Sequence, residues 1–170
     1  MNVCRLVVNL ADDFQLQGWD KDVQIRVSKN PLDKAPDVLV IRPLISQVFA
    51  NVIENAVKYA QRSSVIVIDG MHDPGRDMVI ANVRNHGIPL RTEDARRVFD
   101  RGYRTQEARN LYPAGTGFGL YIARRIVELH EGLVSASTDG QGRVVFTVAL
   151  SVRGLEGKAR EREPKDHSSR

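Results

Sequence analysis

Two asparagines one helical turn apart, Asn51 and Asn55, are the first residues of this sequence that could do chemistry. They lie in segment 44–60, where apolar residues form one broad arc of a predicted helix and both amides fall on the narrow polar arc opposite. Asn is a poor residue inside a helix because its amide competes with the backbone for hydrogen bonds. The pair therefore indicates a further task, such as holding a metal ion or a phosphate, although a plain polar surface stripe would look the same.

Three alternating glycines, Gly115, Gly117 and Gly119, open directly onto a second predicted helix. Glycine lets the backbone approach a ligand closely, and a helix N-terminus offers free N–H groups and a positive dipole end. The natural ligand is a phosphate, although the same pattern also fits a tight turn. The glycines do not follow a strand, and neither GKS nor GKT occurs, so Rossmann and P-loop sites are disfavoured.

The elements that must position these residues are predicted from apolar periodicity. Helices are expected over 3–17, 44–60, 92–98 and from Leu120 to near Gly132, and strands over 23–27, 38–41, 64–68, 78–83, 133–137 and 143–150. Pro43 suits the first turn of the central helix, and Thr92 is expected to cap the short one. This order predicts an α+β fold, a two-layer α/β sandwich with three helices on one face of a mixed sheet of five strands or so. Segment 84–116 lacks regular periodicity, which marks either a functional loop or a wrong assignment.

Composition limits the class of protein. With 170 residues, 42% apolar and 27% charged, the chain is expected to be one soluble domain over 1–152, followed by a disordered charged tail over 153–170. The single cysteine, Cys4, excludes an internal disulfide framework and metal sites built from cysteine alone. No apolar run could cross a bilayer, the start lacks a signal-peptide pattern, and no concentrated basic face indicates nucleic-acid binding.

Four motifs in this order resemble the four boxes of a sensor histidine kinase catalytic domain. That group belongs to the ATP-binding superfamily shared with DNA gyrase, heat-shock chaperones and mismatch-repair ATPases. The resemblance covers roughly residues 1–150, and four boxes in the right order and spacing are specific where any single one is not. The motifs are Asn51-x-x-x-Asn55-Ala56-x-Lys58-Tyr59, Asn85-x-Gly87, Phe99-Asp100-Arg101-Gly102-Tyr103-Arg104 and Gly115-x-Gly117-x-Gly119-Leu120.

The resemblance implies ATP and Mg²⁺ as ligands. Asn55 would coordinate Mg²⁺ through its amide oxygen, Asn51 would face the same ion and the phosphates, and Lys58 would reach a phosphate. Residues 88–116 would be the mobile lid over ATP, from which Arg104 would pair with the terminal phosphate. Catalytic roles would fall to Asn51, Lys58 and Arg104. The implied nucleotide-binding residues are Asn51, Asn55, Lys58, Tyr59, Asn85, Gly87, Arg104, Gly115, Thr116, Gly117, Phe118, Gly119 and Leu120.

Some of these residues also have an ordinary structural interpretation. Tyr59, expected to pack on the adenine or ribose, could be simple packing at a helix edge. Arg101 and Arg104 could be solvated loop charges. Phe99 is interpreted as a core residue that anchors the lid, and the side chain of Phe118 is open to the same interpretation.

One box departs from the family pattern. The family usually has Asp-x-Gly-x-Gly, whose carboxylate accepts a hydrogen bond from the adenine amino group, whereas here Asn85 replaces the acid and Pro89 the second glycine. An Asn oxygen can still accept that bond, but the amide can also flip and donate, so base selectivity and affinity could be weaker. Pro89 also removes flexibility and one N–H at the first hinge of the lid. His86 is interpreted as a loop residue.

The residue at position 51 bears on the reaction. Hydrolysing relatives carry a Glu there as general base, whereas Asn51 cannot take up a proton near neutral pH, and Glu54 is expected to point about 100° away from Asn55. The site should therefore hold ATP without activating water. In the family the nucleophile is a histidine on a separate helical dimerisation domain, and no histidine of this chain lies in that context; His130 is interpreted as a core residue.

The expected function is therefore transfer of the γ-phosphoryl group of ATP to a histidine on a separate dimerisation and phosphoacceptor domain in two-component signalling. A response-regulator receiver domain would be the later partner. The chain would lie in the cytoplasm, either free or as part of a membrane-anchored sensor. Two alternatives stay open: a nucleotide-binding regulatory module with little catalysis, and an anti-sigma-type protein serine kinase.

Overall fold

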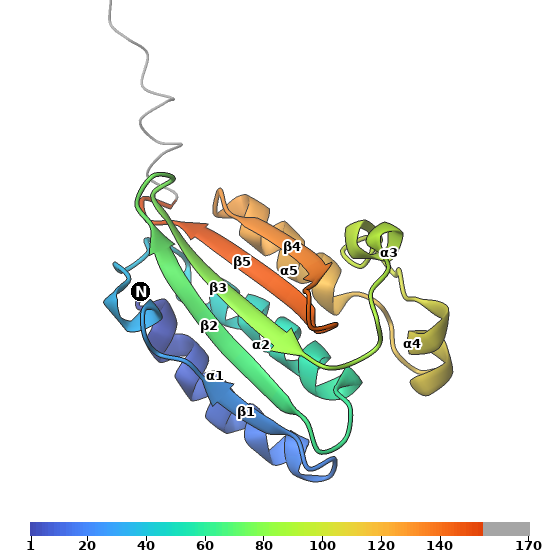
Figure 1. Cartoon of the computed structure of the whole chain (residues 1–170). Coiled ribbons are helices and arrows are strands. Elements are labelled where there is room, and N and C mark those ends of the chain that lie inside the picture. Colours follow the sequence, from blue (N-terminus) through green and yellow to red (C-terminus); the bar gives the residue numbers. More distant parts are fainter. Residues whose placement is uncertain (155–170) are drawn as a thin grey trace, which may run out of the picture.

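One mixed sheet forms the first layer of the molecule. The structure is a computed structural model, and it describes residues 1–154. Within them five strands pair in the order β1-β2-β3-β5-β4, with β1 and β2 parallel and the other neighbours antiparallel (Figure 1). Their bounds are β1 Gln24–Val27, β2 Val65–Asp73, β3 Met78–Asn85, β4 Leu133–Thr138 and β5 Val144–Ser151. Residues 155–170, most of the predicted tail, lie outside the described residues.

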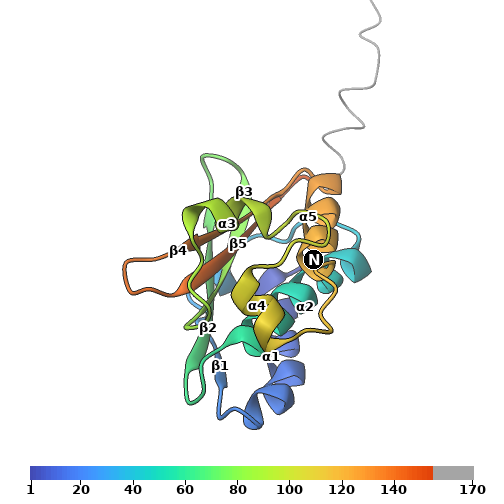
Figure 2. The same ribbon diagram turned by 90° about the vertical axis from the view of Figure 1, so that its right-hand side faces the viewer.

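Three helices form the second layer, all on the same face of the sheet (Figure 2). They are α1 (Val3–Trp19), α2 (Arg42–Tyr59) and α5 (Gly119–Leu129), and α2 packs between the other two. The predicted α+β two-layer sandwich is therefore confirmed. None of the helices in the described part of the chain is long and apolar enough to span a bilayer.

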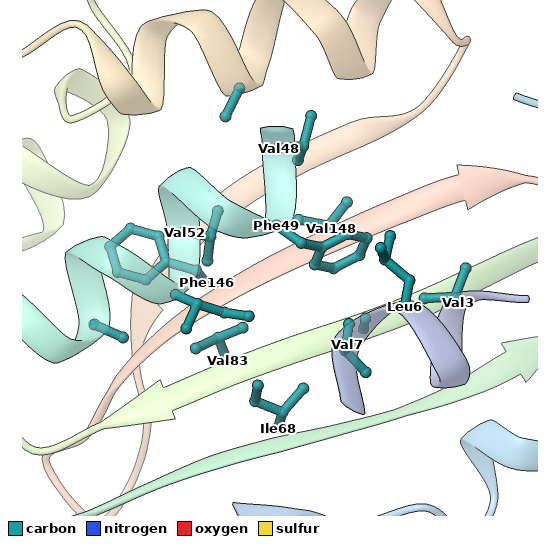
Figure 3. Packing of buried hydrophobic residues seen from close by; sticks show 14 of the residues in the cluster. Val3, Leu6, Val7, Val48, Phe49, Val52, Ile68, Val83, Phe146 and Val148 are labelled. Atoms are coloured by element: carbon teal, nitrogen blue, oxygen red, sulfur yellow. The ribbon is translucent and has the colours of Figure 1, made fainter. Parts of the chain in front are cut away.

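Helix α2 is held in place by its apolar arc. Pro43 lies in its first turn, as predicted, and the arc packs against inward side chains of the sheet such as Ile68, Val83 and Phe146 (Figure 3). Removing each such side chain from water stabilises the fold by about 1.5–3 kcal/mol. This packing fixes the rotation of the helix, so its polar arc is turned away from the core. The buried arc comprises Ile45, Val48, Phe49, Val52, Ile53, Ala56 and Val57.

The predicted strand over 38–41 is wrong. Its backbone N–H groups bond to scattered acceptors: Val38 donates to the Met1 carbonyl at 2.9 Å, and Ile41 donates to Nε2 of His130 at 3.1 Å. The ring of His130 is fully buried, and its Nδ1 lies 2.8 Å from the Ile126 carbonyl oxygen. The interpretation of His130 as a core residue is confirmed. Its ring accepts the hydrogen bond of the Ile41 N–H, which in a strand would go to the carbonyl of a neighbouring strand.

The segment without periodicity contains two short helices, α3 (Thr92–Arg97) and α4 (Gln106–Leu111). The first was predicted, but Thr92 is not its cap: Arg91 occupies the N-cap position, and no side chain caps the helix. Acidic residues Glu93 and Asp94 in the first turn favour the helix start instead. The second was missed because only Ala108 of its six residues is buried, which leaves no apolar period to detect.

A polar network lies on the face of the sheet away from the helices. Asp69 accepts hydrogen bonds from Arg84 at 2.6 and 3.2 Å and from Asn82 at 2.8 Å. Burial alone raises the pKa of the Asp69 carboxyl, but these hydrogen bonds outweigh burial and hold the pKa below its usual range. A carboxyl whose pKa falls on folding stabilises the fold above its unfolded pKa of about 3.9.

Replacing Asp69 with Asn is expected to lower the free energy of unfolding by about 1–2 kcal/mol at pH 7. The difference from the unmodified protein should shrink as the pH falls below ~4, because the contribution of the carboxylate is lost as the pH passes through the folded-state pKa. Urea unfolding at pH 7 and pH 3 measures this. Asp12→Asn, at an exposed position of α1, is the control; an equal loss at both pH values would contradict the assignment.

Candidate functional site

A cleft of about 310 Å³ opens between α2, the end of β3, the segment 88–116 and the start of α5. Its volume falls within the usual range for small-molecule sites, about 300–1,000 Å³. Gly87 and Phe118 of the predicted set do not line it. The predicted residues that do are Asn51, Asn55, Lys58, Tyr59, Asn85, Arg104, Gly115, Thr116, Gly117, Gly119 and Leu120.

The polar arc of α2 forms one wall of the cleft. Nδ2 of Asn51 donates to the Gly119 carbonyl oxygen at 3.0 Å, so this amide ties α2 to the start of α5. Asn55 lies half-buried one turn further along the lining. Glu54 also lines the cleft, as an exposed residue, because positions 51, 54, 55 and 58 follow the spacing of a single helix face.

Asn85 places a buried amide in the cleft. It follows Val79, Ala81 and Val83 on the inward face of β3, a register otherwise filled by apolar core residues. Only 2% of the residue is exposed, and among the described residues its Oδ1 has no hydrogen-bond partner. Leaving a buried acceptor unpaired costs about 1–3 kcal/mol, so this atom is suited to a ligand that brings a donor.

Apolar walls surround that amide, and sequence reasoning missed them. Val144 pairs with Asn85 across the sheet, and Phe146 stacks edge-on against the buried ring of Phe99 at 6.4 Å between centroids. Phe99 therefore belongs to the core, as interpreted. The walls could have been found only by pairing the strands correctly and by folding the aperiodic segment. They comprise Ile88, Leu90, Val98, Val144 and Phe146.

Gly87 lies against the side chain of Asn85 and does not itself line the cleft. A Cβ on Gly87 would meet Nδ2 of Asn85 at 2.5 Å and the Tyr59 carbonyl oxygen at 2.6 Å. Only glycine lets the chain cross the end of α2 this closely. Next to it, the His86 carbonyl accepts the Gln61 N–H at 2.8 Å, so His86 is part of the loop, as interpreted.

The glycine-rich segment brings the third and fourth motifs together. Gly117 has φ of +73°, and a Cβ on it would meet the carbonyl carbon of Gly102 at 2.8 Å. Helix α5 begins at Gly119 on the cleft wall, and Phe118 before it gives no side-chain cap, which leaves N–H groups at the helix start for a ligand. The Phe118 ring is 38% exposed and carries the Arg101 guanidinium 5.6 Å from its centroid.

Arg104 organises the segment over the cleft. Its guanidinium donates to the carbonyl oxygens of Gly115 at 2.7 Å and Ala108 at 2.5 Å, and to that of Tyr112. Arg104 is therefore not a freely solvated loop charge. Its predicted contact with a terminal phosphate stays a prediction, and a phosphate would compete with these carbonyls for the N–H groups of the guanidinium.

Tyr112 anchors the same segment to the end of α2, a contact that the sequence did not indicate. Its hydroxyl donates to the Lys58 carbonyl at 2.9 Å and accepts from Nζ of Lys21 at 2.7 Å. Its ring packs edge-on against Tyr59 at 5.6 Å, and Nζ of Lys58 lies 4.9 Å from its centroid. Tyr59 and Lys58, both expected to contact nucleotide, thus also hold Tyr112 and the segment around it against the end of α2.

Replacing Tyr112 with Ala should release residues 106–112 from α2. Losing the hydroxyl bonds and the aromatic contact removes about 1–2 kcal/mol, so amide hydrogen exchange in this stretch should accelerate about 10-fold. Hydrogen exchange read by mass spectrometry measures this. The control is Leu111→Ala, because its side chain is 61% exposed next to Tyr112. Unchanged exchange in the Tyr112 variant would show that this contact does not hold the segment.

Comparison with known sequences identifies the group to which these motifs belong. The family described as histidine kinase-, DNA gyrase B-, and HSP90-like ATPase matches residues 40–154. Sensor histidine kinase WalK of Bacillus subtilis (strain 168) is 29% identical over 150 residues, 87% of this chain and 24% of the relative. WalK of Staphylococcus aureus is 36% identical over 103 residues, 60% of this chain and 25% of the relative. The chain thus spans about a quarter of the length of these curated relatives.

Solved structures agree on the fold. The nucleotide-free catalytic domain of the histidine kinase ThkA matches with a TM-score of 0.75 at 23% identity, covering 89% of this chain and 95% of that one. Full-length ShkA in complex with AMPPNP matches with a TM-score of 0.73 at 19% identity, covering 91% of this chain and 31% of that one. The resemblance drawn from the four motifs is confirmed, and the chain belongs to the histidine kinase-, DNA gyrase B-, and HSP90-like ATPase family.

Proposed function

We propose that residues 1–152 form an ATP-binding catalytic domain, covered by a lid over 88–116, that transfers the γ-phosphoryl group of ATP to a histidine on a separate dimerisation domain. The single observation that carries the proposal is the unpaired, buried Oδ1 of Asn85 in a cleft with apolar walls. An adenine ring fits such a place, since its faces are apolar and its amino group supplies the donor that Oδ1 lacks.

The opposite part of the cleft is suited to the phosphates. The uncapped start of α5 offers backbone N–H groups, which bind anions well. Lys58 and Arg104 add positive charge along the lining. A nucleoside triphosphate reaching from Asn85 to Gly119 would meet an acceptor at its base, backbone N–H donors at its phosphates, and the cationic side chains of Lys58 and Arg104 along the lining.

The donor set fits Mg²⁺ bound together with substrate. Among the described residues no group of three or more His, Cys, Asp or Glu side chains could hold a metal ion alone. Mg²⁺ commonly takes only one or two protein oxygens and completes its shell with phosphates and water, so the amide of Asn55 would suffice, with Asn51 beside it. Bound Mg²⁺ would supply charge neutralisation for the phosphate oxygens.

The residues of this chain would then position the reaction without supplying the nucleophile. Asn51 cannot act as a general base, and its amide nitrogen is engaged by Gly119. Lys58 and Arg104 would offset the negative charge that develops on the transferring phosphoryl group. The sensor kinases named WalK, of which the chain spans a quarter, support a histidine-bearing partner domain and a later receiver domain in the cytoplasm.

The test mixes this chain with its histidine-bearing dimerisation domain and γ-labelled ATP, after calorimetry has established that ATP binds. Acid-labile label on the partner domain supports histidine transfer. Acid-stable label would identify a serine kinase instead. ATP binding without any transfer would favour the regulatory module, which Asn85 and Pro89, the departures from the family pattern, make the second candidate.

A further inference from the structure

The amide of Asn85 is not fixed in one orientation by its surroundings. Its Oδ1 has no partner among the described residues, and its Nδ2 lies against Gly87, where an added Cβ would meet it at 2.5 Å. A half-turn about the Cβ–Cγ bond exchanges two atoms of nearly equal size. The residue can therefore present either its acceptor or its donor to a ligand at the same place.

Such an amide is complementary to two kinds of purine. The edge of adenine places a donor, the 6-amino group, next to an acceptor, N1. The edge of hypoxanthine places an acceptor, O6, next to a donor, the N1–H. Because one amide atom lies against Gly87, only the other faces the ligand: Oδ1 can accept from the 6-amino group of adenine, and after a flip Nδ2 can donate to O6 of hypoxanthine at the same position.

A carboxylate at this position would behave differently. It has only acceptors, so it would accept from the 6-amino group of adenine but would oppose O6 of a 6-oxopurine with an unpaired, buried negative charge. Sites built around one buried hydrogen-bonding group reject mismatched ligands strongly, up to about 10⁴-fold or more. The exchange of acid for amide removes the basis of that rejection.

We infer that Asn85 makes this cleft accept 6-oxopurine nucleotides as well as ATP, with hypoxanthine as the simplest such base. The inference rests on the proposed nucleotide-binding function and specifies its substrate class. Val144, which pairs with Asn85 across the sheet, and the lining residues Ile88 and Leu90 are apolar, so these three side chains cannot distinguish a donor from an acceptor at position 6 of the base.

The experiment is calorimetric titration of the full chain with ATP and with ITP, each with Mg²⁺. Dissociation constants within about 10-fold of each other are expected for the unmodified protein. Asn85→Asp should keep ATP binding and weaken ITP binding by at least about 100-fold. Asn9→Asp, at an exposed position of α1 that does not line the cleft, should leave the ratio unchanged.

A preference of the unmodified protein for ATP by more than about 100-fold would overturn the inference. The ratio for the unmodified protein decides the question alone, so the result does not depend on whether the buried position tolerates the carboxyl group that the Asn85→Asp substitution introduces. Failure of both nucleotides to bind would overturn the proposed function itself, and this outcome is distinguishable from ATP binding without ITP binding.

Discussion

Replacing Asn55 with Ala is expected to weaken ATP binding in the presence of Mg²⁺ by about 100-fold, and to leave the weaker metal-free binding nearly unchanged. Losing even an outer partner of a metal ligand typically costs about 10–100-fold in metal affinity, so losing a direct ligand should reach the upper end. The fold should survive, because Asn55 lies on the polar arc of α2 and contributes nothing to the buried arc. Calorimetric titration with ATP, in Mg²⁺ and in EDTA, measures the affinity with the metal and without it.

Asn55→Asp is the matched control, since a carboxylate has the same shape and is a better ligand for a hard cation than an amide. It should retain the response to Mg²⁺ that the alanine variant loses. An alanine variant that binds ATP as tightly as the unmodified protein in Mg²⁺ would remove Asn55 from the metal site. Equal losses with and without Mg²⁺ would instead assign Asn55 a direct contact with the nucleotide.

The central helix was predictable because its pattern is redundant. Every residue of the apolar arc used to predict α2, from Val48 to Val57, is buried, and that arc alone fixes which way Asn51 and Asn55 face. The start of α5 was predictable for a related reason: the three glycines interrupt any helix before them, and several apolar residues at helical spacing follow from Leu120. Where several residues carry the same information, single exceptions do not hide it.

The parts that the sequence did not reveal depend on contacts between distant segments. The anchor of Tyr112 joins residues 91 positions apart through Lys21, and no local pattern marks either partner. The apolar walls include Ile88 and Leu90, which belong to the aperiodic stretch. The wrong strand over 38–41 has the same cause, because the buried ring of His130 takes its N–H from far along the chain.

These contacts connect segment 88–116 to helix α2, which forms one wall of the cleft. Arg104 donates hydrogen bonds to backbone carbonyls within segment 88–116. Tyr112 donates to the Lys58 carbonyl and so holds that segment against the end of α2. A phosphate that attracted Lys58 would compete with the contact of Lys58 with the Tyr112 ring, and one that attracted Arg104 would compete with its hydrogen bond to the Gly115 carbonyl. If Lys58 and Arg104 bind phosphate as proposed, ligand binding and the position of segment 88–116 would be coupled through these two side chains, in either direction.

Replacing Gly117 with Ala should weaken ATP binding by about 30–100-fold, from about 2–3 kcal/mol of backbone strain and displacement. Two effects combine at this position. Its φ of +73° disfavours any side chain, and the added Cβ would meet the Gly102 carbonyl carbon at 2.8 Å and the Tyr103 oxygen at 2.9 Å. The glycine segment can relieve the clash only by moving away from the third motif, and this movement would also shift the start of α5 on the cleft wall.

Gly142→Ala separates the two effects. Gly142 has nearly the same φ, +74°, but a Cβ there would meet nothing within 4 Å, and the residue lies in the turn between β4 and β5. This variant should lose about 1 kcal/mol of stability through strain alone and bind ATP normally. Equal ATP affinities for both variants and the unmodified protein, measured by calorimetry, would refute the role of the glycine segment. If both variants lost affinity together, the cause would be general destabilisation. A loss confined to the Gly117 variant would show that ATP binding depends on the close approach of the third and fourth motifs.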